Sequence, residues 1–185
     1  MKKLLENLMN TPSPSGYEEM CINVWDKWMG ENTHCTKEYE DKIGNSGWSI
    51  GSGPIKILLS AHIDEVNSRV QSISESGIIS FINTGGMDKK SLIGSEVLIL
   101  GDKGAIRGVV EKKALHCESD EEYGSSGKIK DFRINVGAES KEEVEELGIY
   151  PGACIVYERR AIVDFGKNQV CGCGLDDKIG VYIVS

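Results

Sequence analysis

The sequence has no long apolar run, few aromatic residues and no excess of positive charge. No segment approaches the roughly 20 apolar residues that a membrane-spanning helix requires, so a membrane protein is not expected. Aromatic residues make up 6% of the 185 residues, and the formal net charge is −8. Nucleic-acid binding requires a basic surface that neutralises phosphates, so this charge balance argues against nucleic acid as a partner.

Cysteine pairs with metal-binding or redox spacing are also missing. The six cysteines are scattered and none belongs to a Cys-x-x-Cys pair, which argues against a zinc knuckle or a disulfide scaffold. The stretch "CGC" (171–173) could hold a redox-active pair, but reduced thiols are the simpler interpretation. The first residues, "MKKLLENLMN", carry Glu6 and Asn7 within their apolar part, and no small-residue cleavage site follows them. A cytoplasmic protein is therefore expected.

Apolar residues recur at helical spacing near the start of the chain. Leucines on one face predict a helix over residues 2–10, and "TPSPSG" (11–16) ends it because proline and glycine break helices. Ser15 and Glu18 have the spacing of a capping box, which predicts a second helix from there to about Met29. The apolar stripe of this helix indicates core packing and consists of Tyr17, Met20, Cys21, Val24, Trp25 and Trp28.

Strand patterns follow the two helices. Residues 38–62 read as strand, turn, strand, turn, strand, and the third strand, "IKILLSA" (55–61), is almost wholly apolar. Such a run is typical of a central strand that is covered on both faces. Further short apolar runs lie at residues 70–74, 77–82, 96–100, 105–110, 114–117, 133–137 and 153–158. Their spacing predicts a small barrel or sandwich, with one helix at about residues 141–147 that Gly148 ends.

These patterns predict an α/β domain interrupted by a compact β domain. The α/β domain is expected to comprise residues 1–66 and 165–185, where the strand–loop–helix texture returns. The β domain is expected at residues 67–164.

The stretch "SAHIDEVN" (60–67) places a histidine and two carboxylates directly after the apolar run. His62 and Asp64 are two residues apart, so in an extended segment they project to the same side. A metal-binding imidazole commonly donates its other ring N–H to a carboxylate, which fixes the ring and raises its basicity. The alternative is a histidine that caps a strand beside a surface acid.

A second motif, "GLDDKIG" (174–180), has two adjacent aspartates after a glycine-rich loop. Adjacent side chains on an extended backbone point in opposite directions, so Asp176 and Asp177 cannot easily reach one ligand. An unusual backbone could still aim Asp176 at a metal; the alternative is an ordinary helix N-terminus, which acids stabilise. Together the motifs favour a hydrolytic site in which a carboxylate bridges two divalent ions. Oxygen and imidazole ligands accept zinc, cobalt or manganese.

With both motifs in place, the sequence resembles the glutamyl-aminopeptidase and deblocking (tetrahedral) aminopeptidase family of co-catalytic metallopeptidases, whose members also carry the names cellulase M and endoglucanase. The matching stretches follow the order of the family: "TPSPSGYE" (11–18), "DKIGN" (41–45), "SAHIDEV" (60–66), "GG" (85–86), "GSEVLI" (94–99), "VGAESKEEVEELGIYPG" (136–152) and "GLDDKIG" (174–180).

The resemblance implies a role for each matching residue. His62 corresponds to the terminal ligand of one metal, Asp64 to the carboxylate that orients it, and Asp176 to the ligand that bridges both ions. A cis peptide bond is expected between Asp176 and Asp177. The implied fold is a zinc-peptidase-like (phosphorylase/hydrolase-like) catalytic domain, interrupted by a small β-barrel (PDZ-like) domain that mediates oligomer contacts.

The sequence departs from the family pattern in composition and in extent. Asn67 stands where glycine is usual, and Lys178 stands where arginine is usual. Family members run to roughly twice this length. Their later half supplies an adjacent pair of glutamates, one the general base and one a ligand, then an aspartate and a final histidine. The expected catalytic domain is therefore incomplete in these residues, which match only the N-terminal half of the family.

The resemblance implies an aminopeptidase that removes N-terminal residues from peptides, in which a hydroxide bridging two divalent ions attacks the scissile carbonyl. The chain by itself is expected to be inactive, because the later ligands and the general base are not among its residues. The alternative is a non-catalytic truncated fragment that forms a homo-oligomer through the β domain. A glycanase is less expected, because Asp64 and Glu65 are too close in sequence to act across a sugar-binding cleft.

Overall fold

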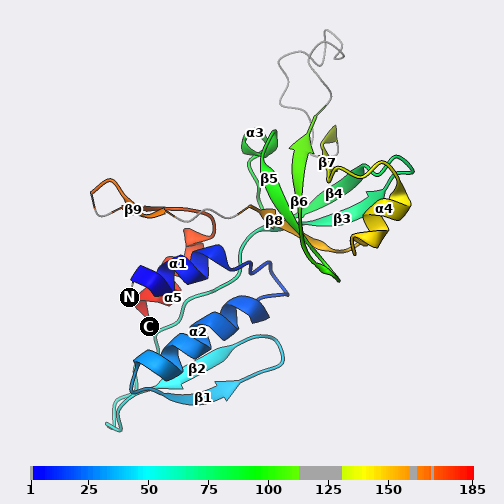
Figure 1. The fold of residues 1–185 in the computed structure, drawn as a ribbon. Coiled ribbons are helices and arrows are strands. Elements are labelled where there is room, and N and C mark those ends of the chain that lie inside the picture. Colours follow the sequence, from blue (N-terminus) through cyan, green and yellow to red (C-terminus); the bar gives the residue numbers. More distant parts are fainter. Residues whose placement is uncertain (1, 113–130, 159–161, 168) are drawn as a thin grey trace. The chain divides into compact units, whose positions relative to one another are not determined.

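The computed structural model describes residues 2–112, 131–158, 162–167 and 169–185. They form two compact units, shown in Figure 1. The first, here called the helical unit, comprises Met1–Glu65 and Arg159–Ser185. The second, the barrel unit, comprises Val66–Glu158. None of the helices in the described ranges is both long and apolar enough to cross a membrane.

The helical unit contains α1 (Lys2–Asn10), α2 (Glu19–Asn32) and α5 (Leu175–Ile183). The predicted first helix is confirmed, because α1 buries its leucine face. The helices share a small apolar core that also takes in residues 61 and 63. Its buried members are Leu4, Leu8, Cys21 and Val181, and the partly buried residues that pack on them are Val24, Trp25, Trp28, Ala61, Ile63 and Tyr182.

The predicted capping box at the start of α2 is wrong. The helix begins at Glu19, after a Glu18 that makes no side-chain cap hydrogen bond to it. The Oε1 atom of Glu18 instead accepts a hydrogen bond from the Gly16 amide at 2.6 Å, and the Ser15 hydroxyl donates to Asp64. The Ser15 hydroxyl, which local spacing assigned to the helix cap, thus donates to the distant Asp64 carboxylate instead. Tyr17 of the predicted stripe precedes the helix and is exposed, and Met20, in the first turn of α2, is exposed as well.

Two short hairpins complete the helical unit. β1 (Thr36–Glu40) pairs with β2 (Ser46–Ser49), and β9 (Ile162–Phe165) pairs with β10 (Gln169–Cys171), both antiparallel.

The predicted central strand at residues 55–61 is not formed. The backbone there belongs to no strand, and the side chains of residues 51–60 are exposed. Ile57 and Leu58 expose 83% and 88% of their surface. A strand needs neighbours that supply hydrogen bonds, and each hairpin of this unit pairs only with itself among the described residues. The apolar pattern of residues 55–61 therefore favours burial, but none of the described residues covers the large side chains of this segment.

The barrel unit is a closed antiparallel barrel, which confirms the predicted barrel architecture. The strands follow the order β3-β4-β7-β6-β5-β8 around it. Their bounds are β3 (Asn67–Ile73), β4 (Ile79–Thr84), β5 (Glu96–Gly101), β6 (Gly104–Glu111), β7 (Arg133–Asn135) and β8 (Cys154–Tyr157). The strand predicted at residues 114–117 lies outside the described residues.

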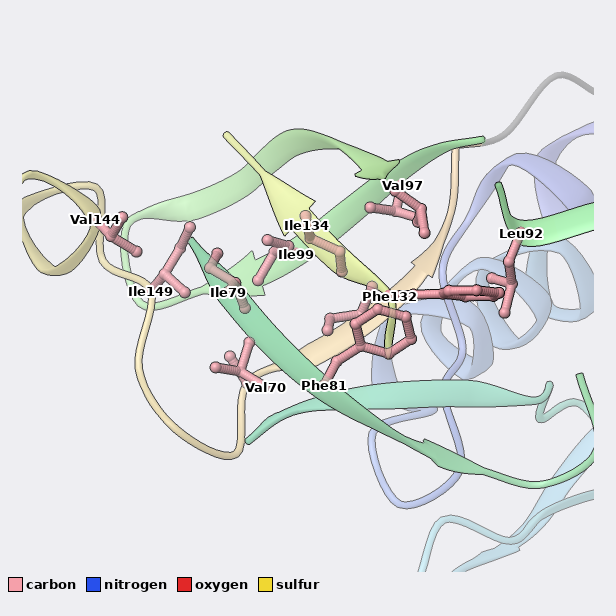
Figure 2. Close-up of a cluster of buried hydrophobic side chains, with 13 residues drawn as sticks. Val70, Ile79, Phe81, Leu92, Val97, Ile99, Phe132, Ile134, Val144 and Ile149 are labelled. Carbon is pink, nitrogen blue, oxygen red and sulfur yellow. The ribbon is translucent and has the colours of Figure 1, made fainter. Parts of the chain in front are cut away.

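Alternating side chains fill the barrel, as Figure 2 shows. On β5, Val97 and Ile99 are buried whereas Glu96 is exposed, the period of two expected for a strand with one apolar face. The core is capped by α3 (Lys89–Leu92) and α4 (Lys141–Glu146), which contribute Leu92 and Val144. The other buried members of this core are Val70, Ile79, Phe81, Val110, Phe132, Ile134, Ile149, Ala153 and Ile155.

Candidate metal centre

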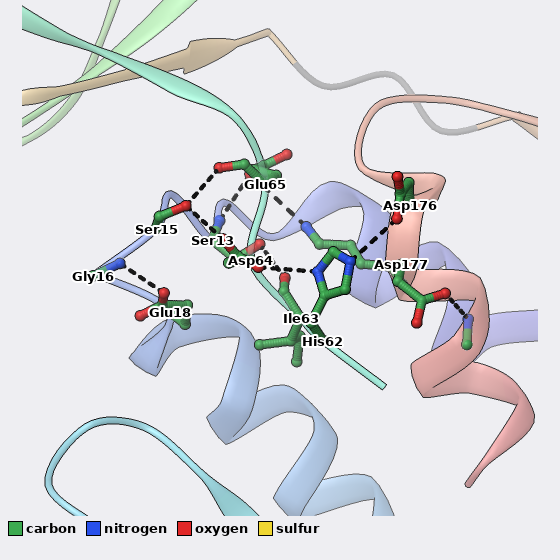
Figure 3. A network of polar contacts seen from close by, with 12 residues as sticks. Ser13, Ser15, Gly16, Glu18, His62, Ile63, Asp64, Glu65, Asp176 and Asp177 are labelled. Carbon is green, nitrogen blue, oxygen red and sulfur yellow. Dashed lines mark hydrogen bonds and ion pairs between the residues drawn. The ribbon is translucent and has the colours of Figure 1, made fainter. Parts of the chain in front are cut away.

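Alternation along residues 61–63 directs His62 out of the helical unit. Ala61 and Ile63 pack against the core that α1, α2 and α5 share, so the residue between them faces the opposite side. The His62 side chain is 58% exposed, and Figure 3 shows its ring between the side chains of Asp64 and Asp176. The imidazole is thus held at the surface by the partly buried apolar residues on both sides of it.

Asp64 fixes the orientation of the His62 ring. Its Oδ1 atom lies 2.9 Å from His62 Nδ1, and its Oδ2 atom accepts a hydrogen bond from the Ser15 hydroxyl. When Nδ1 donates its proton to Asp64, the lone pair of Nε2 is free to bind a cation. The Asp64 carboxylate is therefore held by one contact at each oxygen, and it favours the His62 tautomer with the proton on Nδ1.

Asp176 approaches the other ring nitrogen from a distant part of the sequence. Its Oδ1 atom lies 3.2 Å from His62 Nε2, although the two residues are 114 positions apart. Asp176 and Asp177 both have non-helical backbone angles within α5, and the peptide bond between them is cis. Asp177 points elsewhere, because its Oδ1 atom accepts a hydrogen bond from the Gly180 amide at 3.1 Å. One aspartate thus caps the following helical turns while its neighbour faces the histidine.

The turn before Asp176 depends on a glycine. Gly174 has a φ of 70°, in the left-handed region that side chains other than glycine rarely adopt. A Cβ atom at this position would lie 3.0 Å from Glu65 Oε2, so the backbone also comes unusually close to the His62 segment. This close approach brings the second motif within reach of the first.

The two carboxylates favour the protonated form of the imidazole in the metal-free protein. Partial burial lowers the pKa of His62, but the hydrogen bond and charge of Asp64, together with the charge of Asp176, outweigh it. The net effect is a pKa of His62 above its ordinary value. The site therefore attracts positive charge, whether as a proton or as a metal ion.

The distance between His62 Nε2 and Asp176 Oδ1 fits two donors on one ion. Ligands about 2.1 Å from a tetrahedral zinc ion are about 3.4 Å apart, close to the 3.2 Å found here. A ring lone pair and a carboxylate oxygen would repel each other at this distance unless a proton or cation lay between them. Within the part of the chain that the structure describes, no group of three or more potential ligands comes together. These residues thus offer two donors, fewer than a complete site requires.

Sequence reasoning missed the residues that support the motifs from behind. Ser13 is interpreted there only as part of a helix breaker and Ser15 as part of a helix cap, yet both contact the His62 segment. Two serines that alternate with two prolines could have indicated this role, because the prolines keep the loop out of a helix and leave the hydroxyl groups available for distant partners. Their partners lie about fifty positions away, which local spacing does not encode.

Comparisons with known proteins agree with these motifs. A family model described as M42 glutamyl aminopeptidase matches residues 45–185. The lysyl aminopeptidase of Pyrococcus furiosus is 30% identical over 184 residues, which are 97% of this chain and 52% of that protein.

Solved structures give the same result. A TET aminopeptidase from the marine sediment archaeon Thaumarchaeota archaeon SCGC AB-539-E09 is similar with a TM-score of 0.90 and 29% identity, covering 98% of this chain and 51% of that one. The Pyrococcus horikoshii TET1 peptidase, which can assemble into a tetrahedron or a large octahedral shell, is similar with a TM-score of 0.82 and 32% identity, covering 98% and 53%.

The chain spans about half the length of the curated relatives that it matches. The family model nevertheless covers most of the chain and includes both motifs. The chain therefore belongs to the M42 glutamyl aminopeptidase family.

Proposed function

We propose that these residues supply the first part of a metal-dependent aminopeptidase site that removes N-terminal residues from peptides. The observation that carries the proposal is the meeting of His62 and Asp176 at 3.2 Å, with Asp64 on the opposite ring nitrogen. Both motifs lie in the segment that matches the family. The fold around them would be the zinc-peptidase-like catalytic domain, interrupted by the barrel unit at Val66–Glu158.

Each residue has a definite task in this proposal. His62 would hold metal through Nε2, Asp64 would keep the proton on Nδ1, and Asp176 would serve as the bridging ligand through its exposed carboxylate. Two divalent ions, zinc, cobalt or manganese, would activate a water molecule and polarise the scissile carbonyl. Asp177 stays out of the metal shell because its side chain caps α5.

The remaining ligands and the general base would come from residues outside this chain. Among the residues that the structure describes, two donors face each other, and a carboxylate that shuttles protons must reach the attacking water. The 185 residues alone are therefore expected to bind metal weakly and to hydrolyse peptides poorly.

The barrel unit would mediate contacts between copies of the protein. PhTET1-12s, which is a dodecamer in the asymmetric unit of its structure, is 30% identical and covers the whole of this chain, including the barrel. Size measurements of the purified chain and of the isolated barrel residues would test this assignment.

A metal titration tests the proposal directly. Cobalt(II) added to the chain should produce visible d–d absorption and a shift of the His62 ring resonances. Substituting His62→Ala or Asp176→Asn should weaken binding by about 10- to 100-fold or more. Asp177→Asn is the matched control, because it removes the same charge one position away. Unaltered cobalt affinity in both site variants would contradict the proposed metal centre.

Peptidase activity is tested on a protein that carries the remaining family residues. Mass spectrometry of a peptide panel should show sequential loss of N-terminal residues, abolished by a chelator and by His62→Ala. Cleavage of glucan instead of peptides would favour the glycanase alternative.

A further inference from the structure

Lys178 is buried next to the candidate metal centre, although it takes no part in the chemistry proposed above. Its side chain is 0% exposed, and it lies two positions after Asp176. Burying an ammonium group is costly unless charge and hydrogen bonds compensate for it. The contacts of this side chain therefore indicate what it does in the fold.

The Lys178 ammonium reaches two segments that are far from it in sequence. It donates a hydrogen bond to the Thr11 carbonyl oxygen at 2.8 Å and lies 3.9 Å from Oε1 of Glu65. The Glu65 side chain is itself 6% exposed. The lysine thus connects the start of α5 to the loop after α1 and to the end of the His62 segment.

The loop after α1 completes the connection, because it forms hydrogen bonds with the His62 segment. The Ser13 amide donates to Glu65 Oε1 at 2.8 Å, and the Ser13 hydroxyl donates to the Ile63 carbonyl oxygen at 2.8 Å. The Glu65 amide donates in turn to the Ser13 carbonyl oxygen at 2.9 Å. Figure 3 shows Ser13 and Glu65 beside His62 and Asp64. The loop and the His62 segment are therefore joined by hydrogen bonds and form one support.

We propose that Lys178 is a positioning residue that holds Asp176 opposite His62. Through Thr11 and Glu65 it ties the turn that carries Asp176 to the support that carries His62. Because Lys178 lies two positions from Asp176, loss of its contacts frees the Asp176 turn while His62 and Asp64 remain in place. The functional importance of Lys178 rests on the proposed metal centre, but its effect on the distance between Asp176 and His62 can be measured in the metal-free chain.

The experiment compares four variants of the whole 185-residue chain. Lys178→Met removes the ammonium and leaves Glu65 without it. The double variant Lys178→Met/Glu65→Gln also removes the buried negative charge, which restores the charge balance in the interior, and keeps a side-chain oxygen that can accept from the Ser13 amide. Lys178→Arg keeps a cation that can donate to Thr11. Lys103→Met is the control, because the Lys103 ammonium also donates to a backbone carbonyl, that of Glu146, but in the barrel unit.

Two measurements are made on each variant. Nuclear Overhauser effects between the His62 ring protons and the Asp176 β protons report their proximity without metal. Titration with cobalt(II) then gives the dissociation constant. Lys178→Met and the double variant should lose the Overhauser effects and bind cobalt about 10- to 100-fold more weakly. The Lys178→Arg and Lys103→Met variants should stay within about threefold of the unmodified chain.

The double variant separates positioning from a merely structural role. If it recovers stability together with the Overhauser effects and cobalt affinity, the pair serves only the packing of the interior and the proposal is overturned. Unchanged Overhauser effects in Lys178→Met overturn it as well. Should Lys178→Met fail to fold, the double variant and Lys178→Arg still decide the question.

The two proposals fail in different ways. If the unmodified chain binds no cobalt but loses the Overhauser effects on Lys178→Met, the metal centre is wrong and the positioning role stands. If the chain binds cobalt and Lys178→Met changes neither measurement, the metal centre stands and the positioning role is wrong.

Discussion

A carboxylate faces each ring nitrogen of His62, and these contacts have a measurable effect on its pKa in the metal-free protein. Asp64→Asn should lower the pKa of His62, because it removes both a charge and a charge-assisted hydrogen bond that raise it. The ring resonances followed by NMR across a pH titration give this pKa directly. Asp177→Asn is the control and should leave the titration nearly unchanged, since Asp177 makes its hydrogen bond to Gly180. An equal effect of both substitutions would contradict the pairing with Asp64.

The same raised pKa predicts the direction in which stability changes with pH. The folded chain binds the His62 proton more tightly than the unfolded chain, whose imidazole has a pKa of about 6.5. The stabilisation is therefore complete below pH about 6.5 and is lost as the pH rises through the higher folded value. Urea unfolding on both sides of this window should show a small decrease, because the ring is more than half exposed. The decrease should be smaller in Asp64→Asn.

Gly174 gives a prediction about the backbone of the site. Gly174→Ala forces a side chain into a left-handed conformation, which costs roughly 1–2 kcal/mol. The added Cβ would also lie 3.0 Å from Glu65 Oε2 and push the two segments apart. Denaturant unfolding measures the loss of stability. Gly53→Ala is the matched control, because an added Cβ there meets nothing within 4 Å, and an equal loss in both variants would refute the argument.

At the scale of elements, residues 55–61 form an apolar segment that pairs with no strand among the described residues and exposes most of its large side chains. Extended, exposed and strongly apolar segments are sites of intermolecular strand pairing. The chain should therefore self-associate with increasing concentration, and Ile57→Lys with Leu58→Lys should reduce this. Sedimentation velocity over a concentration series measures the effect.

Ile43→Lys is the control for that experiment. Ile43 is as exposed as Ile57, at 83%, but lies alone in the turn between β1 and β2. If Ile43→Lys reduces association as much as the double substitution, general surface charge is responsible and the extended segment is not.

The elements also show which parts of the molecule local pattern could predict. The helix at α1, the barrel strands and the pairing of His62 with Asp64 follow from spacing alone, because each depends on residues close in sequence. The partner of Ser15 and the missing strand at residues 55–61 do not. Both depend on which distant segment is present to accept a hydrogen bond, and periodicity carries no information about distant partners.

At the scale of the whole molecule, the two units should respond separately to damage in their cores. Phe132 is fully buried in the barrel, so Phe132→Ala should cost about 3–5 kcal/mol in the barrel unit. The pKa of His62 should not change, because that residue belongs to the helical unit. Hydrogen exchange measured residue by residue would locate the loss.

Ile82→Ala tests whether burial is the cause. Ile82 is half exposed on β4 of the same barrel, so its truncation should cost less than about 1 kcal/mol. A loss that spreads equally to α1 and α5 in the Phe132 variant would mean that the units unfold as one.

The closed barrel limits how another molecule can recognise this part of the chain. Among the described residues each of its six strands pairs with a neighbour on both sides along at least part of its length, so no strand offers a wholly free edge to an incoming strand. A partner is then selected mainly by the side chains that project outward, among them Ile82 and Val109. Such contacts can be exchanged a few residues at a time without disturbing the hydrogen bonds that hold the barrel. Its surface can therefore diverge in sequence, and with it the choice of partner, while the barrel itself stays the same.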